Sequence, residues 1–195
     1  MTIALGIIVF GSLAFLFTFW LGEEPASGGI NRQLLNTSWV TETYGEPPIR
    51  LSTPEKLRST FLDGEGPQNM KQFIKDARSY TYSKGAALSI LVNTVAYQTG
   101  VNTNLQGAVE GAIFTLGQQP GIKGLTYETE DVQMNELQGK KVEGTYQVQE
   151  RAFAFTNLLL TDSSHLWQVT VIHPQGDEHG VAITDRILES VKVSP

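Results

Sequence analysis

Cysteine is absent from all 195 residues of the chain. Without cysteine there are no disulfide bonds, no thiolate nucleophile and no cysteine-ligated zinc or iron–sulfur centre. Any catalytic or metal-binding chemistry must therefore use other side chains. The absence is also compatible with an oxidising, extracytoplasmic compartment.

Basic residues are scarce and dispersed. The chain has 14 Lys and Arg against 20 Asp and Glu, a net charge of −6, and its longest basic run is Lys140-Lys141. Nucleic-acid binding and adhesion to anionic lipid headgroups both require clustered Lys and Arg. The composition therefore predicts no nucleic-acid partner.

Catalytic signatures are missing as well. There is no G-x-S-x-G, no H-E-x-x-H and no phosphate-binding loop. Asp162, Ser163, Ser164 and His165 include the residue types of a catalytic triad, but triads are assembled from residues distant in sequence. This run therefore predicts a hairpin turn.

Three acids near one another, Glu128, Glu130 and Asp131, could suggest a hydrolase. Glycoside hydrolysis needs two carboxylates facing each other across a cleft, so an exposed strand face explains these acids better. We predict that the protein is not an enzyme. A hydrolase whose site cannot be seen in one sequence is the least favoured alternative.

Residues 2–21 (TIALGIIVFGSLAFLFTFWL) contain no charged side chain. A helix of about 20 apolar residues spans the hydrocarbon core of a bilayer, about 30 Å thick. Nothing basic precedes the run and no A-x-A pattern follows it, which argues against the alternative of a cleaved signal peptide. The sequence predicts a transmembrane anchor over residues 1–22.

Two opposing signals bear on the orientation of this anchor. Arg32 is the first basic residue after the run, and taken alone it slightly favours a cytoplasmic domain. A short uncharged N-terminus ahead of a long domain is, however, the form of an export signal-anchor. We expect a single-pass protein of the cell inner membrane with a periplasmic globular domain.

The remainder divides into a linker or arm, residues 23–47, and one globular domain, residues 48–195. The arm begins with EEPASGG and carries Trp39 and Tyr44, so residues 31–44 are a candidate contact with a partner protein. Ser52, Pro54 and Glu55 together predict a helix start, through an N-cap and a capping box.

Hydrophobic periodicity predicts the elements of the domain. Residues 79–82 and 88–92 form a hairpin around Lys84-Gly85, with Leu88, Ile90 and Val92 facing inward. A helix is predicted over 105–116, capped by Thr103 or Asn104. Strands over 126–137, 141–149, 151–160 and 166–173 follow, separated at Gly139, Glu150 and residues 162–164. A bulge or one bent strand is expected at Glu150 because one residue cannot form a turn.

A last helix is predicted over residues 181–190. The order of segments near the C-terminus is distinctive: a strand reading LWQVTVIHP, a short polar loop, and AITDRILESVKV. This order resembles the PsbP-like family, whose members end in an aromatic-x-Val-x-Val strand, a helix and Ser-Val-x-Val. The resemblance covers residues 48–195 and implies an α+β fold, an α-β-α domain with an antiparallel sheet flanked by helices.

The family includes the extrinsic subunit that shields the oxygen-evolving side of photosystem II, proteins that bind small GTPases, and exported bacterial proteins. The resemblance therefore implies a docking domain without a common catalytic activity. This chain departs from the photosynthetic members in its predicted membrane helix, so their specific role is not carried over.

The segment from His173 to His179 is the one ligand-rich cluster, and His173, Asp177 and His179 form a candidate zinc or manganese site. Some PsbP-like proteins are reported to hold metal through His and Asp. The alternative is a polar loop whose Asp177 or Glu178 lies near a helix N-terminus. No other cofactor is expected.

Two functions from different classes follow. The first is a non-catalytic accessory subunit that binds an integral-membrane complex, photosynthetic or respiratory, through its N-terminal helix and the 31–44 arm. The second is a tethered periplasmic module that binds a ligand or metal at the His173–His179 loop.

Overall fold

The computed structural model describes residues 27–60, 72–134 and 136–193. The helices are α2 (Ser27–Asn36), α3 (Leu105–Gly117) and α4 (Glu178–Glu189). The strands are β1 (Val40–Tyr44), β2 (Ile49–Thr53), β3 (Arg58–Thr60), β4 (Ile74–Ser83), β5 (Ser89–Tyr97), β6 (Ile122–Met134), β7 (Leu137–Val148), β8 (Arg151–Thr161), β9 (His165–Pro174) and β10 (Lys192–Val193).

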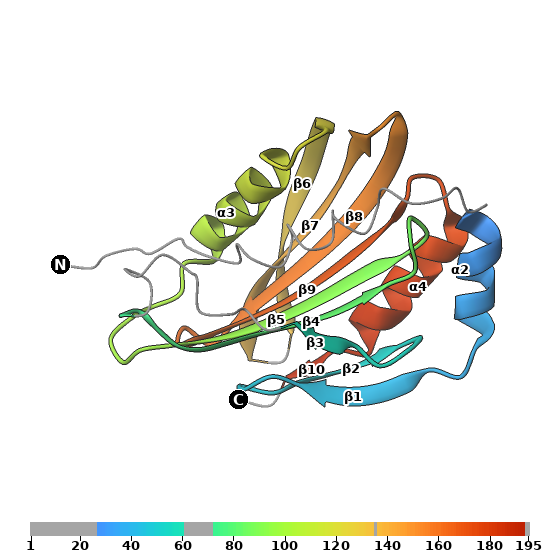
Figure 1. Ribbon diagram of the computed structural model, residues 1–195. Helices are drawn as coiled ribbons and strands as arrows, with labels where there is room; N and C mark the ends of the chain where they lie inside the picture. The colour runs from blue at the N-terminus through green and yellow to red at the C-terminus, as the bar shows by residue number, and fades with distance from the viewer. Residues whose placement is uncertain (1–26, 61–71, 135, 194–195) are drawn as a thin grey trace.

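Seven strands form one antiparallel sheet in the order β3-β4-β5-β9-β8-β7-β6, and β1, β2 and β10 form a small second sheet. In Figure 1, α3 lies on one side of the large sheet, and α4 with α2 lies on the other. This is the α+β, α-β-α architecture that the sequence predicts.

The layering follows from burial on both faces of the central strands. Every residue of β5 is buried. Ile90 and Val92 share one core with Ile183 and Ile187 of α4. On the opposite face, residues of β5, β8 and β9 share a core with the apolar stripe of α3. Each fully buried aliphatic side chain stabilises the fold by about 1.5–3 kcal/mol, so the central strands are held by both helical layers.

Both helices that flank the sheet begin at a cap. Asn104 Oδ1 accepts a hydrogen bond from the N–H of Gly107 at 3.2 Å, as the sequence predicts. Asp177 caps α4, accepting from the N–H of His179 at 3.0 Å and of Gly180 at 3.3 Å. Because of this cap, α4 begins at Glu178, three residues before the predicted start.

Two predicted strand boundaries are wrong. Gly139 lies inside β7, directly opposite Leu160, where an added Cβ would come within 2.6 Å of the Leu159 carbonyl oxygen. Gln149 and Glu150 form a two-residue turn with φ of 49° and 66°. Two positive φ values are what a tight hairpin of right-twisted strands requires, so neither a bulge nor a bent strand is present there.

The helix predicted from Ser52, Pro54 and Glu55 is also wrong. Ser52 lies in β2, which is hydrogen-bonded to β1 on one side and to β10 on the other. The hydroxyl of Thr53 donates to the Glu55 carbonyl at 2.7 Å and closes a turn. Pairing with β1 in a hairpin and with β10 from the far end of the chain outweighs a weak local capping signal.

The described part of the expected 23–47 linker, which holds α2 and β1, packs against the rest of the fold. α2 packs on α4, and Asn31, Leu34 and Tyr44 are buried. Tyr44 accepts a hydrogen bond from the N–H of Leu57 at 3.1 Å. The predicted anchor, residues 1–22, lies outside the described residues. Among the helices that the structure does describe, none has the length and apolar character to cross a membrane.

Candidate functional site

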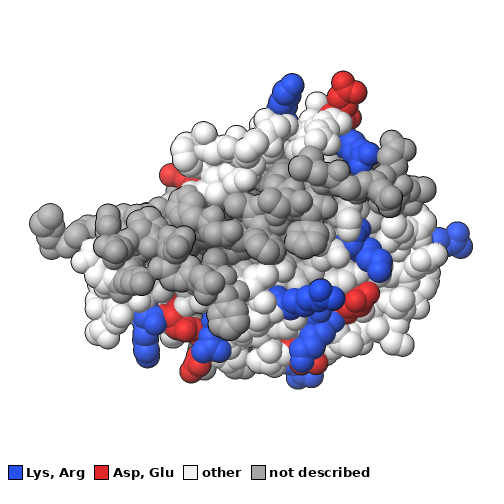
Figure 2. Space-filling model, viewed as in Figure 1, with Lys and Arg blue, Asp and Glu red and all other residues white. Residues whose placement is uncertain are grey.

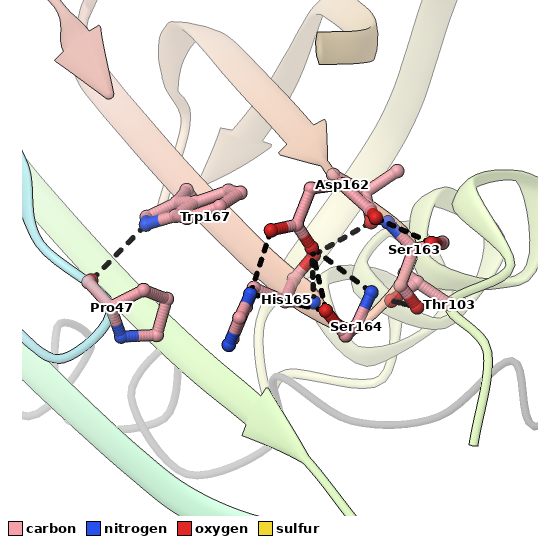
Figure 3. Close-up of polar contacts among 8 residues, drawn as sticks. Pro47, Thr103, Asp162, Ser163, Ser164, His165 and Trp167 are labelled. Carbon is pink, nitrogen blue, oxygen red and sulfur yellow. Dashed lines mark hydrogen bonds and ion pairs between the residues drawn. The ribbon is translucent and has the colours of Figure 1, made fainter. Parts of the chain in front are cut away.

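The turn between β8 and β9 gathers the residue types of a catalytic triad (Figure 3). Asp162 Oδ1 accepts hydrogen bonds from the backbone N–H of Ser164 at 3.0 Å and of His165 at 2.8 Å. Asp162 Oδ2 lies 2.8 Å from His165 Nδ1. Ser163 has a positive φ of 78°. Its carbonyl oxygen accepts a hydrogen bond from the backbone N–H of Thr103. The carboxylate therefore organises the turn, and the hairpin turn that the sequence predicts here is confirmed.

This geometry differs from that of a triad. In a triad the aspartate and the serine contact opposite nitrogens of the imidazole. Here Ser164 Oγ lies 3.3 Å from Nδ1 of His165, the same nitrogen that faces Asp162. The imidazole also packs against Trp167, with ring centroids 5.7 Å apart. The cluster is arranged as a turn that orders β9.

The electrostatics of Asp162 agree with this role. Partial burial alone would raise the pKa of Asp162, but the hydrogen bonds from His165 and from the Ser164 backbone lower it below its ordinary value. The ionised carboxylate is thus the form that the turn stabilises.

His173 is the most enclosed of the predicted metal ligands, with only 4% of its surface exposed. Its Nδ1 lies 2.9 Å from the Pro174 carbonyl oxygen. A carbonyl can only accept, so Nδ1 carries the proton. Burial lowers the pKa of His173 below its ordinary value. The hydrogen bond with Pro174 and the charges of Asp177 and Asp185 act in the opposite direction but are weaker than the effect of burial. The neutral imidazole therefore presents the lone pair of Nε2.

Asp177 and His179 have other contacts. Besides capping α4 through Oδ1, Asp177 accepts a hydrogen bond at Oδ2 from Asn31 Nδ2 at 2.8 Å. His179 Nδ1 lies 3.8 Å from Asp177 Oδ1. Across residues 27–60, 72–134 and 136–193, the structure places no group of three or more His, Cys, Asp and Glu side chains for a metal ion. A metal at His173, Asp177 and His179 would share the Asp177 carboxylate with the hydrogen bonds from Asn31 and from the start of α4.

His173 does line a depression of about 450 Å³ between α4 and the outer half of the sheet, which we call the α4 trough. Its walls come from β6, β7, β8 and the first turns of α4. The lining residues are Thr126, Tyr127, Glu128, Glu143, Gly144, Thr145, Ala154, Phe155, Thr156, His173, Val181, Thr184 and Asp185.

The trough combines acidic side chains with an apolar rim. Glu128 lies directly opposite Glu143 on the neighbouring strand, and Lys141 forms an ion pair with Glu143 at 2.9 Å. Like charges in such cross-strand positions are unfavourable. Val181 of α4, 48% exposed, is a large apolar side chain that lines the trough and is open to solvent, whereas the side chain of Tyr127 lies on the opposite face of the sheet, in register with Gly144 and Phe155.

A larger groove of about 1040 Å³ lies between the start of α3, the β6–β7 end and the 162–165 turn. Polar side chains dominate it, and its Lys140 and Asp131 already form an ion pair at 2.6 Å.

On the face seen in Figure 2, basic and acidic side chains lie next to one another toward the lower edge. Elsewhere in the fold, Lys56 and Glu42 form an ion pair at 3.7 Å, and Arg78 and Asp76 form one at 2.9 Å. The α4 trough is therefore the better candidate site, because its acids outnumber the basic side chains paired with them.

Sequence reasoning found His173 and the acids of β6 but did not bring them together. The alternation of Thr126, Glu128 and Glu130 in the sequence indicates that these polar side chains share one face of a strand. Joining this face to His173 requires the order of β6, β7, β8 and β9 in the sheet, which the sequence does not reveal.

Solved structures with a similar fold include a cyanobacterial PsbP (CyanoP) from Synechocystis. It has a TM-score of 0.56 and 12% identity over 89% of this chain and 99% of that one. LpqN of Mycobacterium tuberculosis, described as involved in cell envelope biogenesis, has a TM-score of 0.50 and 12% identity over 85% of this chain and 97% of that one. No protein-family model matches the sequence, and no curated protein does. At these identities the similarity establishes the PsbP-like fold alone.

Proposed function

We propose that this protein is a non-catalytic accessory subunit that docks on a larger integral-membrane complex. The apolar segment at residues 2–21 tethers it to the inner membrane, and the PsbP-like domain covers the complex on its periplasmic face. A bioenergetic complex, photosynthetic or respiratory, is the partner that the family resemblance suggests.

The PsbP-like fold is the observation that carries this proposal. One fold neighbour is a cyanobacterial PsbP and another takes part in cell envelope biogenesis, and both are matched over nearly their whole length. Fold alone does not fix function, so the site must agree with it. The Asp162–His165 cluster orders a turn, and the α4 trough offers exposed apolar and acidic side chains, which suits binding better than catalysis.

Purification of the tagged full-length protein from membranes in mild detergent tests the proposal. We expect it to elute with integral-membrane proteins at a size well above that of the 21.4 kDa monomer. Elution as a free monomer, without membrane proteins, would contradict the proposal.

A matched pair of variants tests the tether. Lysine at the centre of a membrane helix costs about 2.5–3.5 kcal/mol per residue, so I8K/L13K should release the protein into the soluble fraction. The apolar control I8L/L13I should stay in the membrane. Equal membrane retention of both variants would rule out residues 2–21 as the anchor.

A further inference from the structure

We infer that the α4 trough is the docking site for a basic segment of a partner polypeptide, which places an arginine or lysine side chain against His173. The inference rests on the proposed function, because it names the surface and the chemistry through which the accessory subunit recognises its partner.

The first step is the unused acceptor at the base of the trough. His173 Nδ1 donates to the Pro174 carbonyl, and within the described part of the chain Nε2 makes no hydrogen bond. The ring also packs against α4 at Gly180, where an added Cβ would lie 2.6 Å from His173 Cγ. Nε2 keeps contact with solvent in the trough, so a ligand that donates a hydrogen bond can reach this acceptor.

The second step is charge. Glu128, Glu143 and Asp185 line the trough, and one neighbouring cation, Lys141, is paired with Glu143. The carboxylates that remain favour a donor that also carries a positive charge. Guanidinium and ammonium groups are donors only, and a carboxylate accepts from them more strongly than from a neutral donor.

The third step is the rim. Val181 keeps about half of its surface exposed at the edge of the trough. An exposed apolar side chain beside acidic groups matches the aliphatic stem and charged head of arginine or lysine. A free inorganic cation would gain nothing from this rim, and a volume of about 450 Å³ accommodates a few residues of polypeptide.

The test uses the full-length protein in detergent and two labelled nine-residue peptides of glycine and serine. One peptide contains three arginines and the other has glutamine at the same positions. We expect the arginine peptide alone to bind, with an affinity that falls as salt is raised. Binding should shift the Nε2 resonance of His173 in nitrogen-15 NMR spectra, because Nε2 becomes a hydrogen-bond acceptor.

Charge-matched variants localise the site. E128Q/D185N should weaken binding of the arginine peptide by about tenfold or more, as expected for the loss of close charge pairs. The control E110Q/E150Q removes two exposed charges outside the trough and should change the affinity less than about twofold. Equal effects of the two variants, equal binding of both peptides, or an unchanged Nε2 resonance would each overturn the inference.

These outcomes are separate from those of the proposed function. If the wild-type protein still co-purifies with membrane proteins while the arginine peptide fails to bind, docking occurs through another surface. If the peptide binds as expected but the protein elutes alone from membranes, the accessory role itself is wrong.

Discussion

Gly180 illustrates how closely one residue can constrain a site. It lies in the first turn of α4 against the imidazole of His173, where a Cβ would come within 2.6 Å of the ring. Glycine is normally unfavourable within a helix, by about 1 kcal/mol relative to alanine. Its presence here is explained by the contact with His173, which sets the distance between α4 and β9.

We therefore expect G180A to destabilise the protein by about 1–2 kcal/mol, since overpacking outweighs the gain in helix propensity. The matched control is G29A in α2, where an added Cβ meets nothing within 4 Å. That variant should be neutral or more stable by up to about 1 kcal/mol. Denaturant unfolding measures both, and a G180A protein as stable as G29A would contradict the packing argument.

Asp162 allows a second prediction, which concerns pH. D162A removes the acceptor of several hydrogen bonds in the β8–β9 turn and should cost about 1–3 kcal/mol at pH 7. Because folding lowers the pKa of Asp162, the ionised carboxylate stabilises the folded state above the unfolded pKa of about 3.9. This contribution disappears as the pH falls through the folded pKa.

The free energy of unfolding of wild type and D162A should therefore converge below about pH 3.9. Unfolding curves at a series of pH values measure the difference. D162N is the useful comparison, because its amide oxygen retains an acceptor without the charge, and it should lose less stability than D162A at neutral pH. A constant gap between wild type and D162A at all pH values would disprove the assignment.

At the scale of elements, local patterns predicted those helices and strands whose environment is regular. The stripe of α3 and its Asn104 cap, and the alternation in β5 and β9, were predicted because each is visible within one segment. The errors have separate causes: Ser52 belongs to β2 because β1 and β10 flank it, and residues 149 and 150 form a tight turn although neither is Gly or Asn. The α4 trough could not be predicted because five separate elements build it.

The β7–β8 turn provides a prediction at this scale. Gln149 and Glu150 both adopt positive φ, which costs side-chain-bearing residues about 1 kcal/mol or more each. Asn and Gly are the residues that such turns prefer. Q149N/E150G should therefore raise the free energy of unfolding by about 1 kcal/mol.

The control for this turn variant is Q147N, two residues earlier and inside β7. Asparagine is a poor strand former, so Q147N should be neutral or slightly destabilising. If Q149N/E150G and Q147N change the unfolding midpoint in the same direction, the backbone of the turn is not the source of the effect.

At the scale of the whole molecule, chelation tests the second of the two functions inferred from the sequence. Both oxygens of Asp177 already accept hydrogen bonds, from Asn31 on one side and from the α4 backbone on the other. We expect the full-length protein to unfold at the same temperature with and without a chelator. A fall in the unfolding temperature on chelation, restored by zinc or manganese, would establish a metal site instead.

The boundary of the folded domain gives the most demanding prediction. Leu34 and Tyr44 belong to the core beneath α4, and Asn31 joins α2 to the α4 cap and to the Ala87 carbonyl. A fragment of residues 48–195 lacks all three residues. Loss of a large buried side chain costs about 2–5 kcal/mol, and two such losses approach the 5–15 kcal/mol that stabilises a typical domain.

A fragment of residues 27–195 should therefore unfold cooperatively, whereas a fragment of residues 48–195 should not. Thermal unfolding and the dispersion of amide NMR signals distinguish the two. The double variant L34A/Y44A in the full-length chain serves as the control, because it removes the same packing without shortening the protein. If the shorter fragment folds as stably as the longer one, α2 and β1 are an accessory arm after all. If it fails, α2 and β1 are part of the folded domain and support α4 and the trough beside it.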